Sequence, residues 1–346
     1  MTINAKERGH PDIHAYDQLT GLYNRSHFLK KIKQLDLPKY FPLSIMMGNI
    51  NDLKLINCIF GYNAGDSVID AVAKIFKRNC WREGLVARWS GNVFAAAFPE
   101  TDSCLSPVII RAIKRECELI AAVPIKITIT LGVATKEKND QDIGDVIKNA
   151  EARLDRNKLI EAKNLRSATI ASLVNLLGKK SYETEEHAWR MQSLAVQFGM
   201  ALGLADRQLE DLILTVTLHD IGKLAIPQHL LLKPTRLTPA EKEIIKGHAV
   251  KGCRIVFQSS ELAHLAPAIL THHERWDGRG YPLGLKGEEI PLLARIVAIV
   301  DSYDVMTHER PYKKAMPKKE ARQELLRGAG SQFDPELVKM FLKLDL

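Results

Sequence analysis

The sequence predicts an α+β protein of two domains, an N-terminal domain that mixes strands and helices and an all-α C-terminal domain. Strand patterns alternate with helical patterns early in the chain and fade from about Arg166 onward. The length of 346 residues also suits two domains of ordinary size. We therefore assign an N-terminal domain to residues 1–162, a connecting helix to 163–180 and a C-terminal domain to 181–346.

The N-terminal strands are predicted by short apolar segments. Residues 42–48 and 93–98 are apolar runs of strand length, and residues 125–133 alternate between apolar and polar side chains. A helical pattern over residues 66–78 lies between them. This mixture favours an α/β domain.

The C-terminal elements are predicted by helical periodicity and one capping signal. Residues 181–200 and 206–219 carry apolar side chains at helical spacing, whereas residues 296–300 fit either a helix or a strand. Thr238 predicts the start of a further helix, because a proline follows it and Glu241 completes a capping box.

The connecting segment carries one apolar stripe at helical spacing. Its members are Ile170, Leu173, Val174 and Leu177. The stripe indicates either a helix that packs on the C-terminal domain or a helix that transmits signals or dimerises. A homodimer is therefore one expected assembly.

The charge balance is basic, with 49 Lys and Arg against 41 Asp and Glu, a net charge of +8. This excess indicates either an ordinary solvated surface or attraction of anionic nucleotides. Because no basic stripe has interleaved aromatic residues, we expect no polymeric nucleic acid as a partner.

We expect a cytoplasmic protein with no membrane partner. No apolar run reaches the roughly 18–20 residues of a membrane span, and residues 1–8 are polar and lack a signal-peptide core. The five cysteines are scattered without a Cys-x-x-Cys motif, which is typical of reduced thiols. A metal site in this chain therefore needs histidine and carboxylate ligands.

Histidine and aspartate side chains lie beside apolar runs in three segments. The segments are His272-His273-Glu274-Arg275-Trp276-Asp277-Gly278-Arg279-Gly280-Tyr281-Pro282, His219-Asp220-Ile221-Gly222-Lys223, and the apolar run 294–301 that ends in Asp301. Neutral imidazole and carboxylate groups hold divalent first-row metals. Two such metals a few ångströms apart can activate a water and hold a phosphoester. We therefore expect a buried site with more than one metal ion.

The two motifs resemble those of the HD-GYP phosphodiesterase family, His-Asp-x-Gly-Lys followed by His-His-Glu-x-x-Asp-Gly-x-Gly-Tyr-Pro. The similarity covers about residue 165 to the end of the chain, and the second motif hardly occurs by chance. The resemblance implies an all-helical HD-superfamily domain. It also implies two or three bound metal ions and hydrolysis of cyclic dinucleotides, chiefly cyclic di-GMP.

The resemblance further implies a set of metal ligands, in which Asp220 bridges two ions. The set is Glu183, His187, His219, Asp220, His248, His272, His273 and Asp301. Glu183 resembles the extra ligand of family members with three metals; alternatively, it is a surface acid in an acidic run. The mixed nitrogen and oxygen ligands suit iron or manganese, with zinc as an alternative.

Catalytic and substrate-binding residues are expected around these ligands. Lys223 would act with Asp220 in catalysis, by stabilising developing charge or by assisting the leaving oxygen. The substrate-binding positions that the resemblance implies are Gly280, Tyr281, Pro282, Arg310 and Lys313. Alternatively, Tyr281 packs in the core and the two basic residues lie on the surface.

The N-terminal segment Asp17-Gln18-Leu19-Thr20-Gly21-Leu22-Tyr23-Asn24-Arg25 resembles the opening of the GGDEF (diguanylate cyclase) family, and the similarity extends over about residues 15–164. It implies a ferredoxin-like, cyclase-palm α/β domain. The signature itself has decayed to Ser90-Gly91-Asn92-Val93-Phe94, and Asn49 replaces a metal-binding aspartate. Amide and valine side chains cannot supply the anionic oxygens that Mg²⁺ prefers, so we expect no cyclase activity.

Four other residues of this domain match family positions that contact the nucleotide. Asn57 and Asp66 match guanine contacts, and Lys54 and Lys158 match phosphate contacts. We therefore expect either a domain that still binds GTP, or a scaffold in which Asn57 and Asp66 are turn and helix-cap residues.

Together these features predict a metal-dependent phosphodiesterase that hydrolyses cyclic di-GMP to pGpG, GMP or both, regulated by an inactive GGDEF-like domain. Two alternatives stay open. One is a cyclic-dinucleotide receptor or signalling scaffold without turnover. The other is a phosphodiesterase for another cyclic dinucleotide, such as cyclic GMP-AMP. Proteins with GGDEF domains are further expected partners.

Overall fold

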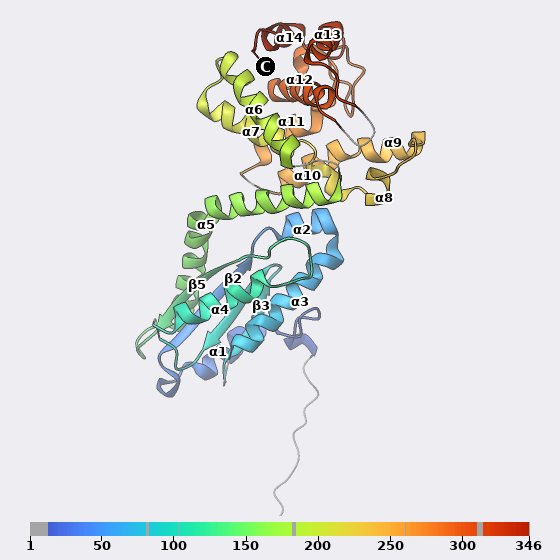
Figure 1. Cartoon of the computed structure of the whole chain (residues 1–346). Helices are drawn as coiled ribbons and strands as arrows, with labels where there is room; N and C mark the ends of the chain where they lie inside the picture. Colours follow the sequence, from blue (N-terminus) through green and yellow to red (C-terminus); the bar gives the residue numbers. More distant parts are fainter. Residues whose placement is uncertain are drawn as a thin grey trace, which may run out of the picture. The chain divides into compact units, whose positions relative to one another are not determined.

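The chain forms two compact units in a computed structural model (Figure 1). The residues that the structure describes are 13–80, 83–102, 104–181, 185–259, 261–309 and 314–345. Unit 1 is Met1–Ile170 and unit 2 is Ala171–Leu346. The division falls inside one long helix, α5 (Ile143–Lys180). The predicted linker bounds of 163 and 180 stay a prediction.

Unit 1 is an α/β domain. Its elements are η1 (Ile13–Ala15), β1 (Tyr23–Asn24), α1 (Arg25–Leu35), η2 (Pro38–Tyr40), β2 (Leu43–Ile50), α2 (Leu53–Phe60), α3 (Tyr62–Asn79), β3 (Leu85–Ser90), β4 (Val93–Phe98), α4 (Ser106–Glu118), β5 (Ile129–Lys136) and the first part of α5. The sheet order is β1-β3-β4-β2-β5, with β1 parallel to β3 and the other pairs antiparallel. From β2 to β5 this is the βαββαβ order of a ferredoxin-like fold, so the predicted fold of this domain is confirmed.

Helices cover both faces of the sheet in unit 1 (Figure 1). On one face, Met47 of β2 belongs to a core cluster with Phe28 of α1 and Ala150 of α5. On the other face, Phe76 of α3 stacks on Phe94 of β4 with ring centroids 5.3 Å apart. Alternate side chains of a strand point to opposite faces, so this sheet is apolar on both sides.

Two predicted strands and the predicted helix of unit 1 are confirmed, and one strand needs correction. Residues 42–48 fall almost entirely in β2, residues 93–98 form β4, and residues 66–78 lie within α3. Residues 125–128 are not a strand, because the β2–β5 pairing begins where Ile50, the last residue of β2, lies opposite Ile129. Before that point Asn51 N–H still donates to the carbonyl of Thr128 at 3.0 Å, but no strand continues. Sequence patterns missed β1 and β3, which are short and include polar residues.

Unit 2 is mostly helical, as predicted. Its elements after α5 are α6 (Glu185–Ala201), α7 (Asp206–Leu218), η3 (Ile221–Ala225), α8 (Gln228–Leu231), α9 (Pro239–Lys246), α10 (His248–Phe257), η4 (Ala263–Leu265), α11 (Ala266–Thr271), η5 (Gly287–Glu289), α12 (Leu292–Thr307), α13 (Lys318–Gly328) and α14 (Pro335–Phe341). The ambiguous residues 296–300 are helical, inside α12. Thr238 caps α9, and Glu241 completes the predicted capping box.

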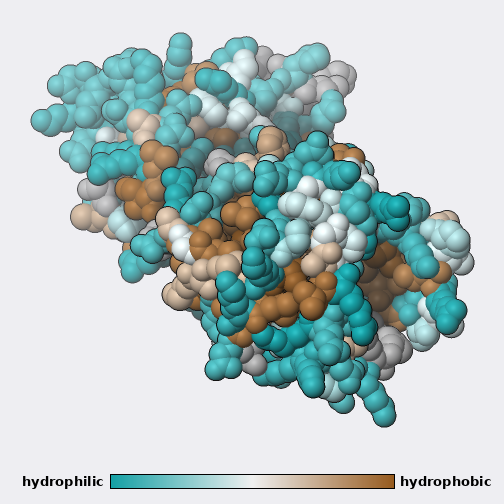
Figure 2. Space-filling model, turned by 90° about the horizontal axis from the view of Figure 1, so that it is seen from above, coloured by the Kyte–Doolittle hydropathy of each residue, from teal (hydrophilic) through white to brown (hydrophobic). Residues whose placement is uncertain are grey.

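The core of unit 2 joins helices that are distant in sequence. Phe198 of α6 packs edge-on against Phe341 of α14, with ring centroids 5.1 Å apart, and Val300 of α12 belongs to the same cluster. Apolar side chains also reach the surface in patches among hydrophilic ones (Figure 2). Single exposed apolar residues such as Trp189 are ordinary for a folded domain.

The predicted apolar stripe lies on α5. Leu173 and Leu177 are buried, and Val174 and Ile170 are partly buried. Val174 and Leu177 line a cavity of unit 2 together with side chains of α6 and α7. This supports the packing role of the stripe. Among the described residues, no helix combines the length and apolar character that crossing a membrane requires.

Candidate metal centre

Helix α7 carries the His-Asp segment into the interior of unit 2. Leu212 and Val216 bury one face of the helix, which ends with His219 as its C-terminal cap. Asp220 follows directly, and both His219 and Asp220 are buried. The apolar helix thus places an imidazole and a carboxylate where water is largely excluded.

A glycine lets the His-Asp segment approach the next ligand. At Gly222 a Cβ atom would lie 1.9 Å from the carbonyl oxygen of His248, a distance that no side chain tolerates. His248 is the first residue of α10 and is buried. Glycine in the His-Asp-x-Gly-Lys motif is therefore explained by close packing of η3 on α10.

The adjacent histidines His272 and His273 follow the end of α11. This short helix has Pro267 in its first turn and buries Ile269. His272 is buried and acts as the C-terminal cap. Both rings consequently lie against those of the preceding segments, with His248 and His273 centroids 5.0 Å apart.

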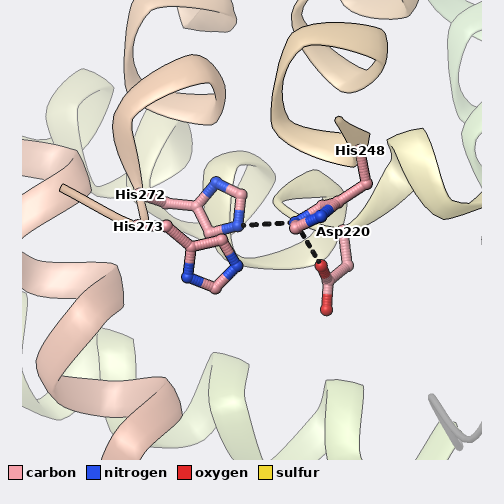
Figure 3. Close-up of side chains that lie close together, drawn as sticks. All are labelled: Asp220, His248, His272 and His273. Carbon is pink, nitrogen blue, oxygen red and sulfur yellow. Dashed lines mark hydrogen bonds and ion pairs between the residues drawn. The ribbon is translucent and has the colours of Figure 1, made fainter. Parts of the chain in front are cut away.

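Four side chains converge in the first of two ligand groups (Figure 3). We call it the Asp220 group; its members are Asp220, His248, His272 and His273. One donor atom from each lies within 4.8 Å of all the others. His248 Nε2 is 3.1 Å from Asp220 Oδ1 and 3.3 Å from His272 Nε2.

The second ligand group, which we call the Asp301 group, consists of His187, His219 and Asp301. Its donor atoms also lie within 4.8 Å of one another. His187 comes from α6 and Asp301 from α12, with Nε2 of the histidine 3.9 Å from Oδ1 of the aspartate. Three helices therefore meet at this group.

Asp220 lies between the two groups. Its Oδ1 atom is 3.1 Å from Nε2 of His248, in its own group, and its Oδ2 atom is 3.2 Å from Nε2 of His219, in the other group. One carboxylate thus faces both sets of ligands. This geometry is what a bridging ligand between two metal ions requires.

Most of the histidines have a fixed tautomer. His219, His248 and His272 each lie with Nδ1 2.7 Å from the backbone carbonyl oxygen three residues earlier. Because a carbonyl oxygen only accepts hydrogen bonds, Nδ1 donates and Nε2 carries the lone pair. The nitrogen that faces the group is therefore the one that can bind a metal.

The electrostatics keep the His272 and His273 imidazoles neutral and Asp220 ionised. Burial holds the pKa of His272 well below its usual range, and burial lowers the pKa of His273 to about 3. Burial alone would raise the pKa of Asp220, but Lys223 and His219 hold it well below its usual range. Neutral imidazole and ionised carboxylate are the forms that bind divalent metals.

The donor set fits divalent metal ions. Seven of the eight predicted ligands fall into the two groups, whereas Glu183 lies outside the described residues. The four-residue group and the three-residue group both offer nitrogen and oxygen donors and no thiolate, a combination suited to first-row metals. The ligand role of each residue stays a prediction.

Lys223 lies at the edge of the centre. Its Nζ donates a hydrogen bond to Asp220 Oδ2 at 2.6 Å. The ammonium group therefore lies beside the proposed bridging carboxylate, where it balances the buried charge.

The loop after the adjacent histidines folds back over them. Tyr281 stacks on the ring of His273 with centroids 4.9 Å apart. Glu274 is buried, and its Oε1 accepts hydrogen bonds from the backbone N–H groups of two later loop residues at 2.6 and 3.0 Å. A Cβ atom at Gly280 would lie 2.4 Å from Glu274 Cα, so glycine permits this fold.

The predicted substrate-binding residues are only partly described. Gly280 and Tyr281 belong to the loop over His273, and Pro282 follows Tyr281 across a cis peptide bond. Burial raises the pKa of Tyr281, so its phenol stays neutral. Arg310 and Lys313 lie outside the described residues.

The predicted nucleotide residues of unit 1 lie on three helices. Lys54 and Asn57 are on α2, Asp66 is on α3 and Lys158 is on α5. Asn57 Oδ1 packs so tightly against Gly65 of α3 that a Cβ atom there would be 1.8 Å away. This packing brings Asn57 beside the residue that precedes Asp66, whereas Lys158 pairs with a neighbouring aspartate on its own helix.

Sequence patterns missed two carboxylates that organise the centre, Glu274 and Asp304. Glu274 holds the loop described above. Asp304, one helical turn beyond Asp301, accepts hydrogen bonds from His187 and Arg190. The spacing of three residues between the two aspartates on an apolar helix is the signal that could have identified Asp304.

The fold and the site together define the class of protein to which each unit belongs. Unit 1 has the α/β fold of a cyclase domain, and unit 2 is a helical domain with a candidate His-Asp metal centre. A family model described as diguanylate cyclase, GGDEF domain, matches residues 14–164, and a model described as HD domain matches residues 171–337. The chain thus consists of an N-terminal GGDEF domain followed by a C-terminal HD domain.

Curated relatives match about half of the chain. The cyclic di-GMP phosphodiesterase of Thermotoga maritima is 42% identical over 179 residues, which are 51% of this chain and 49% of that protein. A probable cyclic di-GMP phosphodiesterase of Vibrio cholerae is 37% identical over 53% of this chain and 45% of its own length. The 3'3'-cGAMP-specific phosphodiesterase 2 of Vibrio cholerae is 34% identical, over 54% and 36%. The chain spans half or less of the length of these relatives.

Proposed function

We propose that this chain is a metal-dependent phosphodiesterase that hydrolyses cyclic di-GMP to pGpG, GMP or both. The observation that carries the proposal is the position of Asp220, which faces two adjacent ligand groups with its two oxygens. A paired centre of this kind suits in-line displacement at phosphorus. The printed names of the relatives support the same activity.

Divalent ions held by the Asp220 group and the Asp301 group would supply Lewis acidity and a water nucleophile at neutral pH. His219, His248 and His272 direct their Nε2 atoms inward, and Asp220 contributes negative charge to both groups. The burial of these side chains excludes bulk water, which strengthens each electrostatic contact.

Lys223 is the protein group best placed to assist the reaction. Its Nζ lies 2.6 Å from Asp220 Oδ2, so one of its three N–H donors holds the carboxylate and the others can reach a phosphate oxygen. In this position Lys223 stabilises charge that develops on the phosphoryl group or on the leaving oxygen.

We propose two or three ions per chain, iron or manganese, because the ligands are nitrogen and oxygen atoms. A third ion would require Glu183 beside His187. If a third ion is held there, elemental analysis of anaerobically prepared protein should approach three ions per chain, and Glu183→Ala should lower the count toward two. An unchanged count would assign Glu183 to the surface.

Cyclic GMP-AMP is the second candidate substrate. It is favoured by the relative named as specific for 3'3'-cGAMP, which is 34% identical over 54% of this chain. The two substrates differ in one base, so the metal centre would serve both.

The GGDEF domain is proposed to regulate the reaction without making cyclic di-GMP. Asn49 and Asn92 offer neutral amides, and Val93 offers no oxygen, where Mg²⁺ needs carboxylates. GTP binding at Asn57 and Asp66, contact with other GGDEF proteins, and a homodimer stay predictions. The five free cysteines fit a reducing compartment such as the cytoplasm.

The test is hydrolysis by the full chain loaded with Fe²⁺ or Mn²⁺, with cyclic di-GMP, cyclic GMP-AMP and cyclic di-AMP as separate substrates. Chromatography of the products distinguishes pGpG from GMP. Turnover of cyclic di-GMP that chelation removes and metal restores supports the proposal. Binding of cyclic di-GMP without turnover of any cyclic dinucleotide would instead make the chain a receptor.

A further inference from the structure

One histidine of the centre is oriented by a different kind of group from three of the others. His219, His248 and His272 donate their Nδ1 hydrogens to backbone carbonyl oxygens. Nδ1 of His187 instead lies 2.6 Å from Oδ2 of Asp304. A carboxylate is a charged acceptor, so this hydrogen bond is stronger and makes the opposite nitrogen a better metal donor.

Asp304 is itself held firmly. It is 1% exposed on α12. Arg190 of α6 donates from Nε to Oδ1 at 2.7 Å and from Nη2 to Oδ2 at 3.1 Å. His308 Nδ1 lies 3.0 Å from Oδ1. A buried carboxylate needs such partners to stay charged, and here they also fix its orientation.

Helix α12 therefore contacts the Asp301 group in two ways. Asp301 belongs to the group directly, and Asp304, one turn further on, orients His187. His187 comes from α6, so the hydrogen bond from its Nδ1 sets how the two helices present their ligands. The Asp220 group takes its members from other segments, after α7, at the start of α10 and after α11.

We infer that Asp304 is a positioning residue for the Asp301 group: it orients the His187 ring, so that binding of a metal ion there depends on it, whereas binding in the Asp220 group does not. This inference rests on the proposed metal centre. Removal of a partner of this kind weakens metal binding about 10- to 100-fold in metal sites generally. We expect the same loss for one equivalent of metal in this chain.

A purely structural role is the competing explanation. The contacts of Asp304 with Arg190 also tie α6 to α12, so their loss would destabilise unit 2 whatever the metal does. Such a role predicts a lower melting temperature with unchanged metal affinity of the folded protein. Metal affinity is therefore the measurement that separates the two explanations.

The experiment is a titration of the metal-free full chain with Co²⁺, followed by its visible absorption bands. For Asp304→Asn we expect one equivalent of Co²⁺, the ion in the Asp301 group, to bind 10- to 100-fold more weakly than in the wild type. A second equivalent, in the Asp220 group, should bind with wild-type affinity. Asp334→Asn is the matched control, because it removes a buried carboxylate that pairs with Arg295 of the same helix α12 at 2.6 Å, and it leaves the His187–Asp304 hydrogen bond in place. This control should melt at a lower temperature and keep the affinity for every equivalent.

Asp304→Asn leaves the Arg190 guanidinium less compensated, so a double variant guards against loss of the fold. Asp304→Asn with Arg190→Gln removes both charges together and should show the same weakened equivalent. Wild-type affinity for every equivalent in a folded Asp304→Asn chain, single or double, overturns the inference. The proposed function is refuted if wild-type protein binds two ions but hydrolyses no cyclic dinucleotide. That result would not contradict the role of Asp304 in metal binding.

Discussion

The two units of the chain differ in the fate of their acidic side chains. In the GGDEF domain the positions at which its family carries metal-binding and signature acids hold Asn49, Asn92 and Val93. In the HD domain the described histidines and aspartates of the predicted ligand set are all present and converge in two groups. The first unit therefore lacks carboxylates at these positions, and the second brings together residues that could hold metal ions.

This difference teaches that fold and metal chemistry depend on separate residues. Asn49 pairs with Val93 across β2 and β4, and the Asn92 side chain donates a hydrogen bond to the carbonyl of Ile50 at 2.9 Å. The replacements therefore fit the sheet, whose core lies in apolar residues elsewhere. The ligands of the HD domain are buried polar groups, which cost stability unless they are paired or hold a metal.

The largest expected effect on hydrolysis comes from substituting Asp220 in the HD domain. Asp220→Ala removes the one carboxylate that faces both groups, so hydrolysis should fall on the order of 10³-fold or more, because a metal clamp contributes several kcal/mol to the transition state. Asp211→Ala is the matched control, since it removes an aspartate–histidine pair from the surface of the same helix. Equal activity of the two variants in a metal-loaded assay would refute the assignment of Asp220.

Lys223 should have the next largest effect. Lys223→Met removes the donor beside Asp220 and should lower kcat about 10²- to 10³-fold, the usual loss for one charge-stabilising donor. The metal content should change little, because Lys223 is not a ligand. Lys339→Met on α14, at an exposed ion pair, serves as the control. A loss of metal in parallel with activity would instead make Lys223 a support of the site.

Much of this centre could be predicted from the sequence because its ligands lie in short, specific motifs. His219, Asp220, His272 and His273 are adjacent pairs beside apolar helices, and the family resemblance added His248. The ferredoxin-like fold was predicted in the same way, from the resemblance to the GGDEF family together with its apolar strands. Motifs and periodicity thus predicted the ligands and elements that depend on residues close together in the sequence.

The features that the sequence did not predict depend on contacts between distant segments. Asp304 orients His187 across 117 positions of sequence, and no local pattern in α12 specifies that partner. The start of β5 is likewise set by where β2 ends, not by the alternation of residues 125–128. Glu274 stands inside a recognised motif, yet its role in holding the loop appears only when the loop is folded.

A third prediction concerns pH in the metal-free chain. The folded-state pKa of His273 is lowered to about 3 from 6.5, and that of His272 is lowered as well. The unfolded chain therefore binds protons more readily, so this contribution to stability is present above about pH 6.5 and is lost as the pH falls toward 3. At pH 5 His273 should cost unit 2 about 2 kcal/mol, and His272 acts in the same direction.

Hydrogen exchange of the metal-free chain at pH 8 and pH 5, corrected for intrinsic rates, compares the two units directly. Protection around α7 and α11 should fall at pH 5, and saturating metal should restore it. The lowered pKa of Asp17 in unit 1 acts only below about 3.8, so that group gives no loss in this range. Loss of protection confined to unit 1 would contradict the prediction.

The smallest effect is expected in the decayed unit, as weak GTP binding without cyclase activity. Asn57 and Asp66 keep the side chains that match guanine contacts, and base recognition needs no Mg²⁺. Without a metal the triphosphate is held by lysines such as Lys54 and by backbone amides, so we expect micromolar affinity or weaker, about −8 kcal/mol at best. GTP regulates hydrolysis only if it binds the active and inactive states with different affinity.

Calorimetric titration with GTP and ATP, paired with hydrolysis assays, tests both GTP binding and its effect on hydrolysis. Binding that Asp66→Ala abolishes and the exposed control Asp70→Ala retains would support a sensor. No binding up to millimolar GTP would leave unit 1 as a scaffold that has kept its fold after losing its ligand.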